Sequence, residues 1–293
     1  MIVADIAVGD LVIRKSHGGD ILFKVTDIEV NESGQKQFTL KGMHLRLLAD
    51  APLEDLEKAD AAHLKRIISE MERKYDASLR RVIERRGMEA EKREMHRSDA
   101  SKKYTSFDVP GRVLHLDGDE DYLKMCLKTY SQLNIEAVGR WIDEEKQPNQ
   151  LLTLLKEVRP DIVVVTGHDA LIGGGKKNFR DINNYRTSKY FVKSVQVARE
   201  FQASRDDLVI FAGACQSYFE AILGAGANFA SSPTRIFIHA YDPVFIAEKV
   251  AFTPISKTVD INDAITASVT GVEGVGGIET RGKFRLGMPK SPY

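Results

Sequence analysis

A thiol and an imidazole follow two similar apolar runs of this sequence. His168 comes soon after the run Asp161–Thr166, and Cys215 comes soon after the run Asp207–Phe211. A cysteine sulfur is a good nucleophile when a nearby histidine takes its proton, and the same imidazole can then protonate a leaving group. Cys215 and His168 are therefore our candidates for the nucleophile and the general base of a hydrolase.

Both runs have the composition of strands that are buried on both faces of a parallel sheet, because they are short, apolar and rich in β-branched residues. The stretch Ser188–Phe201 between them has helical spacing. A strand–helix–strand unit brings the carboxyl ends of both strands to one edge of the sheet, where ligands bind. We therefore expect His168 and Cys215 to meet at that edge.

The alternative for Cys215 is a packing role, because cysteine is among the most buried residue types. Its surroundings favour catalysis: the letters A-C-Q match the centre of the caspase signature, and His168 stands about 50 residues upstream, as in that pattern. The stretch Gln216–Leu223 is predicted to be a helix whose N-terminus favours a thiolate. The backbone N–H groups of Cys215 and Asp169 are the predicted oxyanion hole.

Acidic residues also lie at the predicted sheet edge. Asp117 and Asp119 follow a predicted strand and precede a predicted helix, Glu120–Leu133, and Asp169 follows His168. Asp117 and Asp119 could cap that helix, or hold Mg²⁺ in a phosphohydrolase with an aspartate nucleophile. Any of the three carboxylates could instead bind a basic substrate side chain.

Two further residues have weaker claims to a role. His239 ends a strand that is predicted at residues 235–240, and it is a weaker candidate base. Cys126 lies on the predicted helix Glu120–Leu133 and is predicted to be core. No cofactor and no metal site are predicted from the sequence.

Composition limits the other classes of function. The 293 residues include 42 basic and 42 acidic side chains, so the formal net charge is zero and no global field favours nucleic acid or membrane. Two cysteines allow no disulfide framework, which favours an intracellular protein. The first residues have no basic leader, and no apolar run reaches the length of a membrane span.

The chain divides into three predicted regions. Residues 1–50 have short strands separated by glycine turns, which is typical of a small SH3-like β-barrel. Residues 51–104 are predicted to be a charged helical linker that begins at Asp50–Pro52 and frays toward its end. Residues 105–293 alternate between strands and helices, so we predict an α/β domain with a mainly parallel sheet flanked by helices.

Five blocks of this sequence, in order, resemble the YabG family of sporulation-specific cysteine proteases. The resemblance spans nearly the whole chain, and its blocks are VLHLDGD at 113–119, VTGHD at 165–169, VIFAGACQS at 209–217, AGANFASSP at 225–233 and GGIETRG at 276–282. The family's Cys–His pair maps onto Cys215 and His168. With the order of the strands, this suggests a caspase-like fold.

The resemblance implies a peptidase that cleaves after arginine. Its implied substrates are spore coat and cortex-associated proteins, and the enzyme itself, in the mother-cell cytoplasm or at the spore coat. We then expect Asp117, Asp119 or Asp169 to bind the arginine, and the arginine-rich stretch at 80–97 is the predicted site of self-cleavage. A Mg²⁺-dependent phosphohydrolase and a non-enzymatic coat scaffold are the rival interpretations, and self-association into a homo-oligomer stays open.

Overall fold

A six-stranded sheet forms the centre of the computed structural model, which describes residues 6–30, 34–95, 105–172 and 178–291. The strand order is β12-β11-β10-β9-β7-β8, and every neighbouring pair is parallel except β11 with β12. The strands are β7 (Val113–Asp117), β8 (Ala137–Trp141), β9 (Ile162–Thr166), β10 (Val209–Ala212), β11 (Phe229–Ser231) and β12 (Val275–Gly277). The α/β class and the mainly parallel sheet are confirmed.

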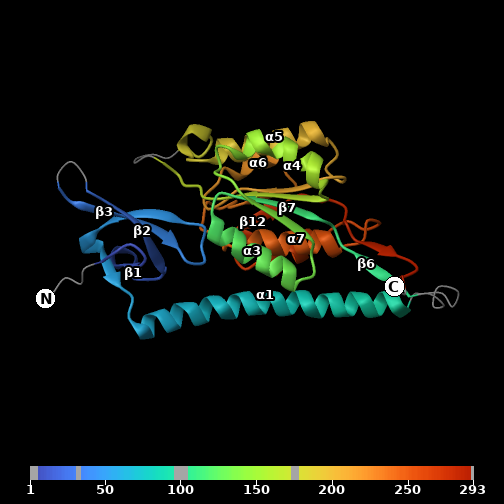
Figure 1. Ribbon diagram of the computed structural model, residues 1–293, viewed down its shortest axis with the longest axis horizontal. Helices are drawn as coiled ribbons and strands as arrows, with labels where there is room; N and C mark the ends of the chain where they lie inside the picture. The colour runs from blue at the N-terminus through green and yellow to red at the C-terminus, as the bar shows by residue number, and fades with distance from the viewer. Residues whose placement is uncertain (1–5, 31–33, 96–104, 173–177, 292–293) are drawn as a thin grey trace.

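Helices cover both faces of this sheet (Figure 1). One face packs against α4 (Gln147–Val158), α5 (Ser188–Phe201) and α6 (Phe219–Gly224). The other packs against α3 (Glu120–Gln132), α7 (Asp242–Phe252) and α8 (Ile261–Ala267). Because β9 and β10 lie in the middle of the sheet, all of their residues are buried, which explains their continuous apolar sequences.

The N-terminal region is a separate antiparallel sheet of order β4-β3-β2-β1-β5. Its strands are β1 (Leu11–Arg14), β2 (Phe23–Val30), β3 (Lys36–Gly42), β4 (Leu48–Pro52) and β5 (Leu56–Lys58), with short 3₁₀ turns η1 (Lys15–His17) and η2 (Leu53–Asp55). In the described residues β4 and β5 stay edge strands, so no closed barrel forms. The SH3-like assignment stays a prediction.

The predicted start of the linker helix at Asp50–Pro52 is wrong. These residues belong to β4, and the sheet continues to β5, which pairs with β1. The leucines at 53 and 56 have helical spacing, but Leu56 is buried in the core of the N-terminal sheet. Tertiary pairing therefore overrides the local pattern, and α1 (Ala61–Met95) begins only afterwards.

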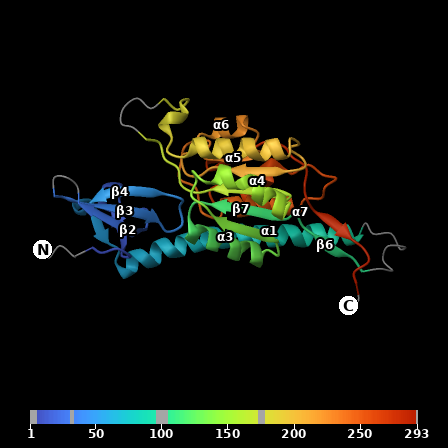
Figure 2. The ribbon, with the colours of Figure 1, turned by 45° about the horizontal axis from the view of Figure 1, so that its top comes forward.

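Helix α1 begins beside the N-terminal sheet and then runs along the α/β domain (Figures 1 and 2). Its Tyr75 packs against Tyr241 with ring centroids 4.5 Å apart, and Val82 is buried in the same core. Near its end, Arg85 and Arg86 both pair with the buried carboxylate of Glu248 on α7. The predicted fraying is therefore wrong as far as Met95, and Arg97 lies outside the described residues.

Two smaller features complete the fold. The strands β6 (Phe107–Val109) and β13 (Arg285–Gly287) form a two-stranded sheet, and η3 (Ile182–Asn184) and η4 (Gly271–Glu273) are 3₁₀ turns. The fifth strand of the central sheet is β11, so the strand predicted at 235–240 is wrong. No helix in the described part of the chain is both long and apolar enough to cross a membrane.

The ion pairs of Glu248 give a prediction about stability. Glu248→Gln leaves two arginines of α1 without their buried partner, so we expect the free energy of unfolding to fall by about 3 kcal/mol. The matched control is Glu70→Gln, which removes the exposed pair with Lys74 and should cost less than about 1 kcal/mol. Urea denaturation measures the free energy of unfolding of both variants. Equal losses would contradict the view that the ion pairs of Glu248 fasten α1 to the α/β domain.

Candidate active site

His168 and Cys215 follow neighbouring parallel strands at the same edge of the sheet. Val165 of β9 stands opposite Ala212 of β10, and His168 and Cys215 come three residues after these positions. Both side chains are buried. Among the described residues no hydrogen bond joins the sulfur to the imidazole. The predicted convergence at one edge therefore matches the topology.

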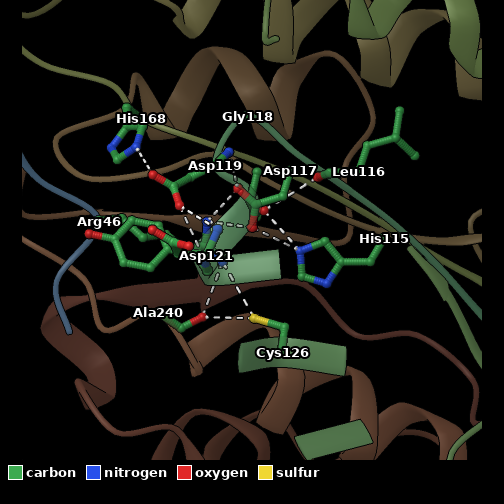
Figure 3. A network of polar contacts seen from close by, with 12 residues as sticks. Arg46, His115, Leu116, Asp117, Gly118, Asp119, Asp121, Cys126, His168 and Ala240 are labelled. Carbon is green, nitrogen blue, oxygen red and sulfur yellow. Dashed lines mark hydrogen bonds and ion pairs between the residues drawn. The ribbon is translucent and has the colours of Figure 1, made fainter. Parts of the chain in front are cut away.

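A carboxylate holds the His168 ring on one side. Nε2 of His168 lies 3.0 Å from Oδ2 of Asp119, whereas Nδ1 is buried and has no hydrogen-bond partner among the residues that the structure describes (Figure 3). The Tyr122 ring lies 5.5 Å from the imidazole, centroid to centroid. With Nε2 engaged by Asp119, Nδ1 is the nitrogen that is available for a proton from a neighbouring group.

The backbone of His168 is fixed by Glu144, whose Oε1 accepts its N–H at 2.6 Å. Two glycines make room for this carboxylate: a Cβ added at Gly118 or Gly167 would lie 2.2 or 2.1 Å from the same oxygen. Burial raises the pKa of Glu144, and the His168 N–H opposes that rise. Glu144 thus positions the histidine loop, a role that the sequence analysis did not detect.

Cys215 lies in a tight turn, which places the sulfur against the backbone of Ile238. The Ile238 N–H donates to Sγ at 3.2 Å, and the neighbouring Gln216 has a left-handed φ of 56°. Helix α6 begins only at Phe219, so the predicted helix N-terminus at the sulfur is wrong. Burial raises the pKa of the Cys215 thiol to about 12, so the thiol is protonated in this conformation.

Asp169 holds the cysteine loop rather than lining an open pocket. Its carboxylate accepts hydrogen bonds from the Ser188 and Ser217 hydroxyls and from the Thr187 N–H. Ser217 Oγ in turn accepts the N–H of Ala214, next to the cysteine. These contacts favour a bracing role for Asp169. In the described parts of the chain, no acceptor engages the backbone N–H of Asp169 or of Cys215.

The side chain of Arg46 is fully buried beside Asp117, in a polar site that we call the Asp117 pocket (Figure 3). Nη1 of Arg46 donates to both carboxylate oxygens, at 2.9 and 2.8 Å, and both side chains are fully buried. Nη2 donates to the Ala240 carbonyl oxygen at 3.2 Å and to Sγ of Cys126 at 3.6 Å. Burial by itself would raise the pKa of Asp117, but the guanidinium outweighs that effect and the pKa is lowered.

Asp119 has the capping role that was one of its predicted alternatives. Its side chain accepts the N–H groups of Asp121 and Tyr122 at the start of α3. Burial tends to raise its pKa, but His168, the helix N–H groups and Lys41 together lower it well below the ordinary range. Lys41 belongs to β3, and its ammonium lies 3.1 Å from Oδ2 of Asp119. The carboxylate is therefore ionised beside the imidazole.

Three residues around Arg46 have the donor atoms of a possible metal site. Ligand atoms of His115, Asp117 and Cys126 all lie within 4.8 Å of one another. The Arg46 guanidinium contacts two of the three, and its fixed charge opposes a cation at that point. Asp119 is already bonded to an imidazole and two helix N–H groups. These donors do not form the open set of oxygen ligands that Mg²⁺ prefers, so the phosphohydrolase interpretation gains no support.

Comparison with known proteins decides the family. The model of the YabG peptidase U57 family matches residues 7–289. This chain belongs to that peptidase family. It is also 42% identical over 286 residues to the sporulation-specific protease YabG of Bacillus subtilis (strain 168), which covers 96% of this chain and 97% of the relative. The function of the chain is therefore that of a peptidase in sporulation, and the resemblance noted from the sequence is confirmed.

Sequence reasoning missed two residues of this peptidase site besides Glu144. Arg46 lies in the loop between β3 and β4, inside the region that was predicted as short strands and turns. Tyr122 lies on α3, and its hydroxyl donates to the Leu45 carbonyl oxygen at 2.6 Å. His239, the weaker candidate base, is buried, and burial lowers its pKa to about 3, which makes it a poor base near neutral pH.

The environment of Asp119 predicts a specific acid sensitivity. A carboxyl group whose pKa is lowered in the folded state adds stability above its unfolded pKa of about 3.9, and that stability is lost as the pH falls through the folded value. We therefore expect Asp119→Asn to be less stable than the wild type at pH 6 and to lose less stability below about pH 4. Urea unfolding from pH 6 down to about pH 2 measures this, and parallel curves of stability against pH for the two proteins would contradict it.

Proposed function

We propose that this peptidase is a cysteine endopeptidase in which Cys215 is the nucleophile and His168 is the general base and acid. The placement of the two residues after adjacent parallel strands supports this, as do the paired Nε2 and unpartnered Nδ1 of His168. A caspase-like fold is part of the proposal. Its support is a sheet in which consecutive parallel strands carry His and Cys and the last strand is antiparallel.

The reaction proceeds in two steps. The Cys215 thiol gives its proton to Nδ1 of His168 while the sulfur attacks the scissile carbonyl carbon, and the backbone N–H groups of Cys215 and Asp169 bind the resulting oxyanion. The imidazolium then protonates the departing amine as the C–N bond breaks, which leaves a thioester. Water attacks the thioester with His168 as base, and the carboxylic acid product and the thiol are released.

Asp119 stabilises the charged intermediate of this mechanism. Because burial keeps the thiol protonated in the observed conformation, a thiolate forms only when His168 becomes positively charged. The ionised carboxylate of Asp119, 3.0 Å from Nε2, favours that imidazolium and fixes the ring. A Cys–His pair with an orienting carboxylate is a recurring arrangement for nucleophilic catalysis.

The preference for arginine is assigned to Asp117, and one observation carries this assignment. A guanidinium from another part of the chain, that of Arg46, already lies in the pocket and donates to both oxygens of Asp117. The Ala240 carbonyl oxygen accepts from the same group, so the pocket provides acceptors in the pattern that an arginine side chain needs. Of the three carboxylates considered, Asp117 fits the role best.

The biological setting of the proposal comes from the family. The relative is a sporulation-specific protease, and the family resemblance points to spore coat and cortex-associated proteins as substrates in the mother cell, with self-processing. No nucleic-acid or membrane partner is proposed. The predicted self-cleavage within 80–97 gains little support, because α1 is helical to Met95 and a peptidase cleft takes an extended chain.

The nucleophile can be tested by replacing one atom. We expect Cys215→Ala to lower kcat/KM for an arginine-containing peptide by at least about 10³-fold, because removing the nucleophile leaves only the residual effect of binding and the oxyanion hole. Peptide hydrolysis is followed by chromatography, and thermal unfolding shows whether the variant is folded. Turnover at the wild-type rate by folded Cys215→Ala would reject the cysteine mechanism.

The arginine pocket can be tested with a matched pair of peptides that differ only in arginine or its neutral isostere citrulline. We expect Asp117→Asn to lower kcat/KM for the arginine peptide by about 10²- to 10³-fold, because one member of a buried charge pair is lost, and to change the citrulline value much less. A loss of equal size for both peptides would mean that Asp117 has only a structural role.

A further inference from the structure

The loop between β3 and β4 pairs with residues 238–240, next to Cys215. Leu45 forms an antiparallel bridge with His239. On either side of this bridge, the Arg46 N–H donates to the Ile238 carbonyl oxygen at 3.1 Å, and the Ala240 N–H donates to the His44 carbonyl oxygen at 2.8 Å. This is the backbone pairing by which a peptide adds as a strand to an exposed edge.

The pairing places Arg46 next to the candidate nucleophile. The carbonyl oxygen of Ile238 that accepts the Arg46 N–H also lies 3.8 Å from Sγ of Cys215, and the Ile238 N–H donates to the same sulfur. The Arg46 side chain fills the Asp117 pocket at the same time. Backbone and side chain of Arg46 thus have the positions expected of a substrate arginine.

The loop is nevertheless not aligned for cleavage. In the described part of the chain, no N–H group donates to the Arg46 carbonyl oxygen, so its peptide bond is not polarised. The chain turns back at once, because the Leu47 N–H donates to Leu45 and the Gly42 N–H donates to the Leu47 carbonyl oxygen. Tyr122 binds the carbonyl oxygens of Gly42 and Leu45 and holds the loop closed.

We propose that residues 238–240 and the Asp117 pocket form the subsite for a substrate arginine and the two residues before it, and that the chain's own loop 43–47 occupies this subsite as an inhibitor in cis. The proposal rests on the proposed function. A protein substrate binds only after the loop has left, and it then repeats the contacts of His44, Leu45 and Arg46. The N-terminal sheet is accordingly a regulatory domain that presents one inhibitory loop.

The first experiment compares peptide binding to inactive variants. The probe is a fluorescein-labelled peptide with the sequence of residues 42–47, and the background is Cys215→Ala, so that the peptide is not consumed. We expect Arg46→Gln in this background to bind the probe at least about tenfold more tightly, because a site that is free in more molecules has a higher apparent affinity. The control Arg14→Gln, in the same domain but paired with Asp55, should leave the affinity unchanged.

Unchanged or weaker binding by folded Arg46→Gln would overturn the proposal. Because this variant leaves Asp117 buried without its partner, a second measurement uses the unaltered loop. Hydrogen exchange of Cys215→Ala protein is recorded with and without saturating probe. We expect the Arg46 N–H to lose protection when the probe binds, while the Ala240 N–H stays protected by the peptide. Binding that leaves the Arg46 N–H protected would also overturn the proposal.

These readouts separate the inference from the proposed function. Neither of them needs catalysis, whereas the Cys215→Ala hydrolysis assay tests the mechanism alone. Hydrolysis that depends on Cys215, together with binding that does not displace the loop, refutes inhibition in cis and leaves the mechanism in place. Displacement of the loop without Cys215-dependent hydrolysis refutes the mechanism and leaves the arginine subsite in place.

Discussion

The buried ion pair between Arg46 and Asp117 is the interaction on which the rest of the site depends. Both side chains are fully buried, and a buried charge is tolerated only when a partner and further hydrogen bonds compensate for the lost water. The pair joins the N-terminal sheet to the end of β7. It therefore fixes where the loop 43–47 lies, and in the proposed inhibition in cis it keeps the arginine subsite filled.

Helix α1 connects the two domains and keeps the loop 43–47 near the arginine subsite. Helix α1 links the N-terminal sheet to the α/β domain and packs along it, so the loop is always close to the cleft. A tethered ligand has a high effective concentration, and weak contacts then suffice to keep a site filled. In the proposed mechanism, release of the loop need not unfold the α/β domain, because the loop contacts it chiefly through His44, Leu45 and Arg46.

Inside the α/β domain, the local sequence pattern predicted an element well where burial or contacts with near neighbours in the chain determine its structure. β9 is buried on both faces, and its sequence is apolar throughout, so its position was predicted closely. Asp119 caps α3 by a contact with near neighbours in the chain. The periodicity of Ser188–Phe201 matched α5 at both ends. The convergence of His168 and Cys215 followed from the handedness of the crossover between their strands.

The sequence by itself thus determined the class of fold and the placement of His168 and Cys215 after neighbouring strands at one edge of the sheet. Only the tertiary structure decided which carboxylate faces a guanidinium, that α6 begins beyond Cys215, and that Arg46 lies in the pocket. The physical reason is that periodicity records whether a side chain is buried. It does not record which distant group compensates a buried charge, and Arg46 and Asp117 are 71 residues apart in the chain.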